Sequence, residues 1–363
     1  MRSNTVEGRA QSKMAGRLSP MPTVAEIVKL YRLSAKRQLS QNFLLDMNIN
    51  RKLVKAAGRI TNGHVCEVGP GPGGITRAIL DKHVEHVVVI EKDSRFIPSL
   101  QSLSRESNNR VRVILGDVLY FDMSRLFPEE LISSWEEDPP NIHIIGNLPF
   151  NVATPLIIRY LESISKQTSV WRYGRVRMTL TFQKEVADRM VSPILTNERC
   201  RLSAMCQNWC HVTRKFEIPG SAFVPKPKVD VGVVHFLPRI KPMIPLPFKL
   251  VEKVCKHVFH HRNKKLLFGM KTLFPPDLHY LAEESLRITD IPEDTRSYML
   301  TLSELGRLCS VYSDICEEYA HVFAYDYRSQ EGQKLIRDDR YRRRQQREGQ
   351  DSEQNPLSVE NGE

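Results

Sequence analysis

A glycine-rich turn between an apolar run and a helical pattern limits the fold of this chain more than any other stretch. Residues 67–74 read EVGPGPGG; the apolar pair Val65 and Cys66 precedes them, and ITRAIL at 75–80 is typical of a helix. A strand, a glycine turn and a helix in this order form the first unit of a doubly wound α/β fold. Ligands of such folds bind at the carboxyl ends of the strands, so we expect this turn to line a binding site.

The chain downstream repeats the alternation of strands and helices, which predicts a parallel sheet covered on both faces. Strands are expected at 64–68, 86–90, 111–115, 142–145 and 176–182, and helices at 74–80, 94–103, 155–164 and 183–190, with a weaker helical pattern around 125–135. Two further strands, 211–218 and 231–236, are joined by a segment too short for a crossover helix and should pair antiparallel. A mostly parallel sheet with a terminal antiparallel hairpin is the Rossmann-like class I fold of methyltransferases that use S-adenosylmethionine (SAM).

The spacing of the turn leaves two ligands open. Gly69-x-Gly71-x-x-Gly74 is the dinucleotide-binding spacing, in which backbone N–H groups face a pyrophosphate. However, Pro70 and Pro72 lack that N–H donor, and Glu67, at the end of the strand, would place a negative charge near the phosphates. SAM carries no phosphate and has a positive sulfonium, so the turn favours SAM over NAD.

Acidic residues follow at the ends of the next two predicted strands. Glu91 ends the second strand, where a carboxylate can hold both hydroxyls of a ribose. Asp117 ends the third strand, where it can accept a hydrogen bond from an adenine amine while the Val118 backbone N–H donates one. A solvated strand end would explain either acid alone, but two successive strand ends favour a nucleoside site.

The fourth strand ends in Asn147-Leu148-Pro149-Phe150. An adenine amine is a poor nucleophile because its lone pair is delocalised into the ring. The Asn147 amide oxygen and the Leu148 carbonyl can each accept one of its hydrogens. Pro149 fixes the turn, and Phe150 offers a face for stacking a base. The alternative is an ordinary strand end with an apolar anchor.

The charge of the chain favours a polyanionic partner. Its 363 residues include 53 Lys and Arg against 42 Asp and Glu, a net charge of +11, which is typical of nucleic-acid-binding proteins. A basic organellar protein or one with a charged tail is the alternative. Seven scattered cysteines without a C-x-x-C pair indicate a reducing compartment. The stretch from Cys255 to His261 fits a basic helix face better than a zinc site, so no metal is expected, and no apolar run is long enough to span a membrane.

The predicted domains are a transit peptide or disordered extension at 1–23, a methyltransferase domain at 24–240, a smaller helical RNA-binding domain at 241–325 and a disordered charged tail at 326–363. The first segment contains Arg2, Arg9, Lys13 and Arg17 with one acid, Glu7, a composition typical of mitochondrial transit peptides. We therefore expect the mitochondrial matrix. A plain disordered extension, or a start at Met14, remains open.

Long motifs resemble those of the rRNA adenine N(6)-dimethyltransferases, most closely the vertebrate mitochondrial members, also called mitochondrial transcription factors of the B type. The motifs are QNFLLD, EVGPGPGGITRAIL, IEKD, GDVL, GNLPF, FQKEVADR and FVPKPKVDVGVVHF, in the family's order. The resemblance implies a SAM-dependent monomer that transfers two methyl groups to each of two adjacent adenosines. These lie in a hairpin loop near the 3′ end of small-subunit rRNA, in the immature small ribosomal subunit.

The family's site residues carry over by motif. The resemblance implies that Asn42 and Leu44 close over SAM and that Gly69 and Gly71 pass under its methionine part. It implies that Glu91 with Lys92 binds the ribose and that Asp117 with Val118 binds the adenine. It also implies that Asn147 contacts both the cofactor and the target amine, and that Phe223 covers the face of the base opposite Phe150.

Two other functions remain open. One is a non-enzymatic accessory factor for mitochondrial RNA polymerase, as the alternative family name suggests; an intact SAM turn and an intact NLPF motif argue against lost catalysis. The other is adenine methylation of DNA, which shares the Asn-x-Pro-aromatic turn. The QNFL and FVPKP segments favour the rRNA group.

Overall fold

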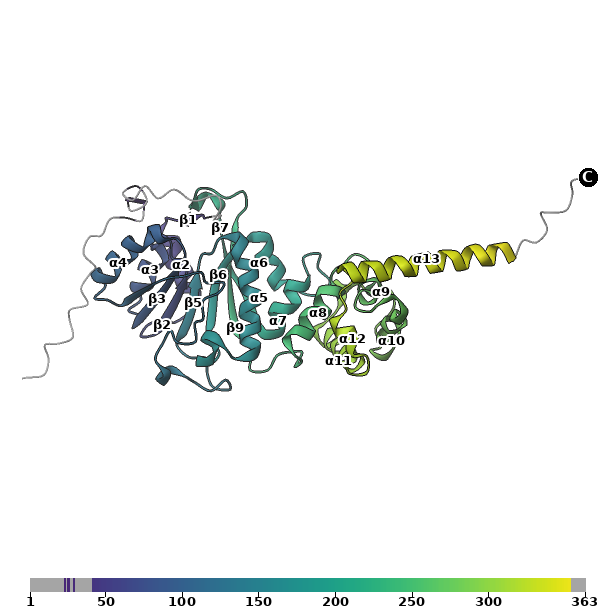
Figure 1. Cartoon of the computed structure of the whole chain (residues 1–363). Coiled ribbons are helices and arrows are strands. Elements are labelled where there is room, and N and C mark those ends of the chain that lie inside the picture. Colours follow the sequence, from purple (N-terminus) through teal and green to yellow (C-terminus); the bar gives the residue numbers. More distant parts are fainter. Residues whose placement is uncertain (1–22, 24, 27–28, 30–40, 354–363) are drawn as a thin grey trace, which may run out of the picture.

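A seven-stranded, mostly parallel sheet forms the centre of the molecule in the computed structural model, which describes residues 23, 25–26, 29 and 41–353 (Figure 1). The strand order is β4-β3-β2-β5-β6-β9-β7. Neighbouring strands from β4 to β6 are parallel, whereas β9 runs antiparallel to both β6 and β7. The strands are β2 (His64–Val68), β3 (His86–Glu91), β4 (Val111–Leu115), β5 (Ile142–Gly146), β6 (Arg177–Gln183), β7 (Cys210–Ile218) and β9 (Val231–Pro238). The predicted fold class is confirmed, including the terminal antiparallel pair.

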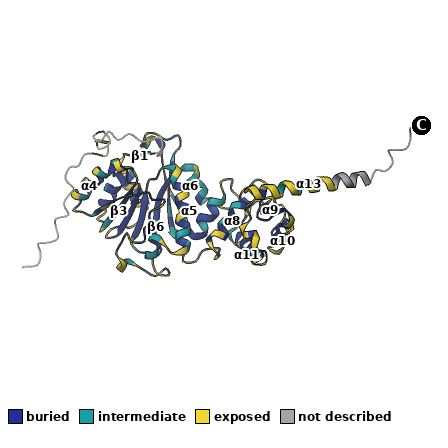
Figure 2. Cartoon of the chain, viewed as in Figure 1, coloured by how far each residue is buried: buried dark blue, intermediate teal, exposed yellow. Residues whose placement is uncertain are grey.

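Helices cover both faces of the sheet because successive strand residues point to opposite sides. Val87 and Val89 belong to one apolar cluster, and Val88 and Ile90 to the other. The first cluster includes side chains of α2 (Met47–Ala56), α3 (Gly74–Leu80) and α4 (Ile97–Glu106), and the second those of α5 (Phe150–Lys166), α6 (Lys184–Val191) and α7 (Arg201–Trp209). Figure 2 shows the strands as a buried layer between these helices.

The chain after β9 forms a group of helices beside the sheet-containing part (Figure 1). They are α8 (Phe248–Val258), α9 (Leu266–Lys271), α10 (Tyr280–Ile288), α11 (Leu302–Glu318) and α12 (Ala320–Ala324). Their apolar side chains belong to the same cluster as those of α5 and α7. One continuous core therefore connects the sheet with the C-terminal helices.

The charged C-terminal segment differs from the predicted disordered tail, because Gln330–Glu353 forms the helix α13. Its beginning packs against the short 3-10 helix Pro276–Leu278, and Ile336 is partly buried. Asp339 and Arg343 add an ion pair of 2.8 Å one turn apart. Disorder was expected because the segment is polar in composition. The composition does not reveal these contacts, and Arg, Gln, Lys and Glu all have a strong helix propensity.

Two further segments differ from the expected structure or lie outside the described residues. The segment around 125–135 contains only the 3-10 helix Glu129–Leu131, because Tyr173 bonds the loop: its hydroxyl accepts from the Phe127 N–H (3.2 Å) and lies 3.1 Å from the Ser124 carbonyl oxygen. The predicted transit peptide, 1–23, lies outside the described residues except for Thr23. None of the described helices is long and apolar enough to cross a membrane.

Candidate active site

A two-lobed pocket lies at the carboxyl ends of β2, β3, β4 and β5, where the glycine turn was expected to line a site. The two lobes contain about 540 and 680 Å³ of open space, including solvent at their mouths. Gln41, Gly69, Glu91 and Pro149 line both. The first lobe is also lined by Asn42, Phe43, Leu44, Pro70, Gly71, Pro72, Gly74, Ile75 and Asn147, and the second by Ile90, Lys92, Gly116, Asp117, Val118, Leu148, Asn151 and Val152.

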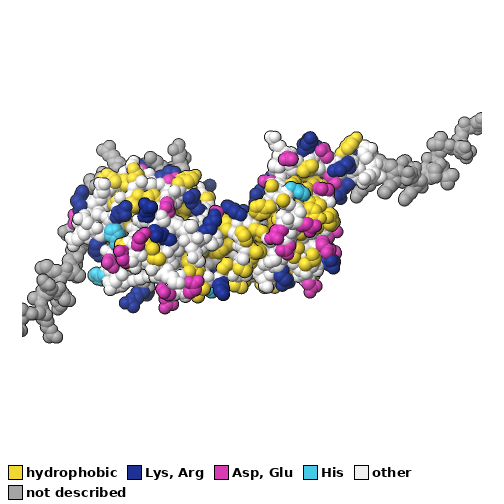
Figure 3. All heavy atoms as spheres, turned by 60° about the horizontal axis from the view of Figure 1, so that its bottom comes forward, with side chains coloured by type: hydrophobic (Ala, Val, Ile, Leu, Met, Phe, Trp, Pro, Cys, Tyr) yellow, Lys and Arg dark blue, Asp and Glu magenta, His cyan; other side chains and the backbone are white. Residues whose placement is uncertain are grey.

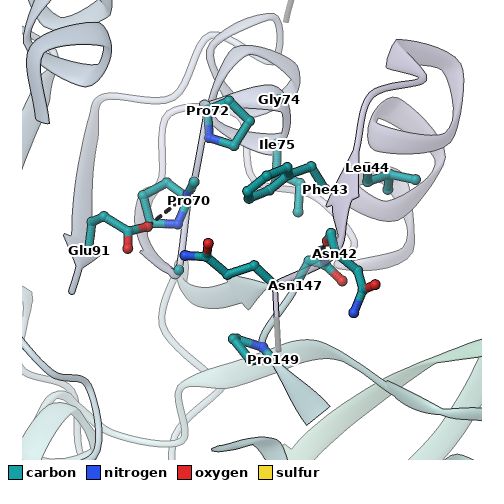
Figure 4. Close-up of a pocket in the computed structure, with 13 residues that line it drawn as sticks. Asn42, Phe43, Leu44, Pro70, Pro72, Gly74, Ile75, Glu91, Asn147 and Pro149 are labelled. Atoms are coloured by element: carbon teal, nitrogen blue, oxygen red, sulfur yellow. Dashed lines mark hydrogen bonds between the residues drawn. The ribbon is translucent and has the colours of Figure 1, made fainter. Parts of the chain in front are cut away.

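The glycine turn is fastened to the end of β3 through Glu91. Gly69 and Gly71 have φ values of +68° and +52°, which residues with a side chain adopt only with strain. The Gly71 N–H donates to Glu91 Oε2 (2.9 Å), and the Asp93 N–H donates to Oε1 (2.8 Å). Burial raises the pKa of Glu91, while these hydrogen bonds act in the opposite direction. Figure 4 shows Glu91 on the opposite side of the first lobe from Asn42.

Asp117 stands at the end of β4 as an ion pair with Lys92. Lys92 Nζ lies 2.7 Å from Asp117 Oδ2, and the Leu119 N–H donates to Oδ1 (3.0 Å). Burial alone would raise the pKa of Asp117, but the hydrogen bonds from Lys92 and Leu119 and the charge of Lys92 hold it below its usual value. The second lobe therefore contains an ionised carboxylate at neutral pH.

Asn147 follows β5 directly, and its amide group is held at both ends. Nδ2 donates to the Asn42 carbonyl oxygen (3.0 Å), and the Thr181 hydroxyl donates to Oδ1 (2.7 Å). Because a carbonyl oxygen can only accept, the nitrogen must point to Asn42 and the oxygen to Thr181. The amide oxygen has two lone pairs, so one can still accept another hydrogen bond.

Residues 41–44, which we call the strap, lie over the first lobe. Gln41 Nε2 donates to Asp93 Oδ2 (3.3 Å), and the buried Asn50 donates to the Leu44 carbonyl oxygen (3.2 Å). Strand β1 (Phe43–Leu44) pairs antiparallel with β8 (Phe223–Val224). The QNFL and FVPKP motifs, far apart in sequence, are thus one structural unit.

Gln41 and Phe43 line the pocket but were missed by sequence reasoning. Figure 4 shows the Phe43 ring reaching from the strap toward the glycine turn. A Cβ on Gly71 would lie 3.6 Å from this ring. The signal was present, since both residues belong to QNFL, but nothing in the sequence ranks the four positions.

All predicted site residues line the pocket except Phe150 and Phe223. Phe150 is half-buried at the first position of α5. Phe223 is only 2 % exposed, and its backbone pairs with Leu44. Both rings pack in the apolar cluster of α2, α3 and α4. In this structure Phe223 therefore offers no open face to a base.

Glu67 does not face the pocket, although the sequence placed its charge beside the ligand. It is fully buried next to Thr76. Burial raises the pKa of Glu67 to about 8; hydrogen bonding from Thr76 opposes this rise, and the negative charge of Glu91 adds to it. The side chain is therefore mostly neutral at pH 7, and the pocket receives its negative charge from Glu91 and Asp117 instead.

Glu67→Gln should remove a pH-dependent loss of stability. The ordinary pKa is 4.5 and the folded value is about 8, so the stability that the neutral acid contributes is complete below 4.5 and is lost as pH rises toward 8. From pH 5 to pH 8 we expect the unfolding free energy of the variant to rise relative to that of the wild type by on the order of 3–4 kcal/mol. Urea unfolding across this range measures it. The exposed Glu106→Gln should track the wild type; a constant Glu67→Gln difference at all pH values would contradict the account.

The profile of the ribosomal RNA adenine dimethylase family matches residues 32–304. The chain belongs to this family. Among similar proteins, "Dimethyladenosine transferase 1, mitochondrial" of Xenopus laevis is 51% identical over 315 residues, covering 86% of this chain and 92% of that protein. The Homo sapiens protein of the same name is 52% identical over 315 residues, covering 86% and 91%. "Mitochondrial dimethyladenosine transferase 1" of Bos taurus is 50% identical over 333 residues, covering 91% and 98%.

Solved structures agree on the fold. A dimethyladenosine transferase from Plasmodium falciparum superposes with a TM-score of 0.59 at 22% identity, covering 74% of this chain and 96% of that chain. The 23S rRNA methyltransferase ErmE gives 0.52 at 19% identity, covering 75% and 100%. Family membership makes the chain an rRNA adenine N(6)-dimethyltransferase whose methyl donor is SAM.

The residues of the pocket fit SAM. A buried carboxylate, Glu91, stands where the two lobes meet, so it can accept hydrogen bonds from a ribose between a methionine part and an adenine part. Pro70 and Pro72 lack the N–H donors that a pyrophosphate would require.

Proposed function

We propose that this protein dimethylates the N6 amines of two adjacent adenosines in the 3′-terminal hairpin loop of mitochondrial small-subunit rRNA. It acts in the mitochondrial matrix, during assembly of the small ribosomal subunit. The mitochondrial relatives and the motif resemblance support the substrate and the compartment. The observation that carries the chemistry is the fixed amide of Asn147 at the edge of a pocket that contains Glu91 and Asp117.

The chain's part in the reaction is to orient the target amine. Bound SAM supplies an activated methyl group. The remaining lone pair of Asn147 Oδ1 accepts one amine hydrogen, and the Leu148 carbonyl oxygen accepts the other. These two hydrogen bonds favour a pyramidal nitrogen with its lone pair directed at the methyl group. Alignment accounts for the acceleration, and the proton released passes to water.

The same pocket assigns the cofactor contacts. Glu91, with Lys92 beside it, holds the ribose, and Asp117 with the Val118 N–H holds the adenine. Gly69 and Gly71 pass under the methionine part, where a side chain would crowd the ligand. Asn42 and Leu44 close over it, because the strap crosses the first lobe.

The target adenosine must leave its stack to reach the pocket, which costs a few kcal/mol. Phe150 is the aromatic residue that we assign to the flipped base, because it follows Pro149 at the pocket rim and is half-buried. For Phe223 to stack on the other face, β8 would have to move with the strap that it pairs with. Figure 3 shows basic and acidic side chains over both parts of the face in view, with apolar side chains gathered more densely over the C-terminal helices.

Incubation with radiolabelled SAM tests the function. The substrates are a transcript of the 3′ hairpin with its flanking helices, the same transcript with both loop adenosines replaced by guanosines, and immature small subunits. We expect up to four methyl groups per molecule on the adenosine hairpin or on the subunits, and none on the guanosine transcript. Label on the guanosine transcript, or on neither adenosine substrate, would overturn the proposal. Label on double-stranded DNA instead would assign the chain to DNA methylation.

A further inference from the structure

A threonine on the neighbouring strand holds the amide of Asn147. Strands β5 and β6 are parallel with Gly146 opposite Leu180, so Asn147 lies beside Thr181. Thr181 is fully buried, and its hydroxyl donates to Asn147 Oδ1 over 2.7 Å. Thr181 lines neither lobe of the pocket. Its contact with the site passes through Asn147.

We propose that Thr181 is a positioning residue for methyl transfer, a role that rests on the proposed function of Asn147. The hydroxyl occupies one lone pair of Oδ1 and so directs the other toward the pocket. Without it the amide keeps only the bond to Asn42 and can rotate about its side-chain torsion, which is broad and two-fold. A misoriented acceptor lowers the fraction of bound adenosine in the reactive geometry.

Thr179 provides a matched control. It lies two residues earlier on β6, on the same face, is 1 % exposed, and its hydroxyl lies 2.9 Å from His235 Nδ1. Thr179→Val thus removes an equally buried hydroxyl away from the pocket. Thr181→Val removes the bond to Asn147, and Thr181→Ser retains the hydroxyl.

Single-turnover methylation at saturating SAM should fall about tenfold in Thr181→Val, while Thr181→Ser and Thr179→Val stay within about threefold of the wild type. SAM affinity by calorimetry should change by less than threefold. In Asn-selective 15N spectra, the Asn147 side-chain amide signals should shift or broaden in Thr181→Val only. The proposal would be overturned if Thr181→Val reacted at the wild-type rate or if both valine variants lost activity equally. Unchanged Asn147 signals in Thr181→Val would also overturn it. If the wild type left rRNA unmodified, that result would refute the proposed function. The spectra would still test whether Thr181 positions Asn147.

A second observation concerns the two faces of α13. Ile336, Asp339, Arg340 and Arg343 line a pocket against the C-terminal helices, together with Pro276 and His279 among others. Lys334, Arg337, Tyr341 and Arg344 recur at helical spacing on the other side and are all exposed, and one acid, Asp338, is exposed among them. Tyr341 is 66 % exposed. Figures 1 and 2 show α13 leaving the body of the molecule with most of its surface exposed.

We infer that this outer face of α13 (Lys334, Arg337, Tyr341 and Arg344) binds rRNA outside the methylated hairpin. Three cations within eleven residues span about 15 Å of helix, and the face keeps a net positive charge beside Asp338, so it can meet more than one phosphate. Tyr341 between them can stack on an unpaired base. The docked inner face fixes the direction of the helix, so the contact adds RNA affinity without entering the pocket. This inference rests on the proposed RNA substrate.

The test neutralises the outer face in a triple variant, Lys334→Gln, Arg337→Gln and Arg344→Gln. A control removes the same charge from Lys55, Lys82 and Arg105, which are exposed near the carboxyl ends of α2, α3 and α4. The carboxyl ends of these helices lie toward the edge of the sheet opposite the pocket. Affinities are measured for a minimal hairpin and for a longer fragment with its flanking helices, across salt concentrations.

We expect the triple variant to lose about tenfold or more in affinity for the longer fragment at low salt, with a salt slope smaller by about 2–3. Affinity for the minimal hairpin, and its methylation, should stay within twofold. Equal losses in the control variant, or no loss, would overturn the inference. The inference would also be overturned if the triple variant kept its RNA affinity but lost binding to vesicles that contain anionic lipid. That result would make the outer face a membrane contact.

Discussion

Asn147→Ala is expected to lower the rate of methyl transfer by about 10²–10³-fold, the size of effect typical when an enzyme loses one aligned polar group that acts on the reacting atoms. The variant loses the amide oxygen that accepts the amine hydrogen, and Leu148 alone cannot fix the nitrogen. Rapid-quench methylation of the hairpin at saturating SAM and RNA measures the rate.

RNA affinity should remain nearly unchanged in this variant, because it arises mainly from Lys and Arg against phosphates. Asn48→Ala, an exposed asparagine on α2, should methylate as the wild type does. If Asn147→Ala modifies the hairpin at the wild-type rate, the assignment of the acceptor is wrong. A parallel loss of RNA affinity would instead show that Asn147 binds the substrate rather than orients it.

Strand ends made much of the pocket predictable. Glu91, Asp117 and Asn147 each follow an apolar run, and parallel strands bring their carboxyl ends to one edge. Apolar patterning and turn residues therefore locate these side chains from the sequence alone. The same reasoning predicted the antiparallel strand pair, because the connecting segment is too short for a crossover.

The direction of a side chain from a strand end was harder to predict. Glu67 stands at the penultimate position of β2, and the alternation of the strand turns it into the core beside Thr76. A buried acid costs free energy unless it is neutral, so sequence reasoning favours exposure at the ligand. The structure resolves the conflict by raising the pKa of Glu67 rather than by exposing it.

Contacts between distant segments were not predictable from local pattern. The pairing of Leu44 with Phe223, and the bond from Thr181 to Asn147, depend on which strands become neighbours. From the sequence, Phe223 fits a base-stacking position and a core position equally well. Only the packing of β8 distinguishes the two positions. The helical state of 330–353 likewise depends on the docking of Ile336.

Glu91→Ala is expected to raise the dissociation constant for SAM about 10–100-fold, since hydrogen bonds to a charged group contribute about 1.5–3 kcal/mol each. The carboxylate has two tasks in this structure. It accepts from the Gly71 N–H and so fixes the glycine turn, and it lies where the two lobes meet, within reach of a ribose. Alanine removes both, and Glu91→Gln should fall between, because an amide offers one acceptor to two backbone donors. Calorimetric titration with SAM measures the affinity, with the exposed Glu106→Ala as the control. SAM affinity within threefold of the wild type in Glu91→Ala would remove Glu91 from the cofactor site. A fall in melting temperature with that same unchanged affinity would leave Glu91 only the structural task of holding the turn.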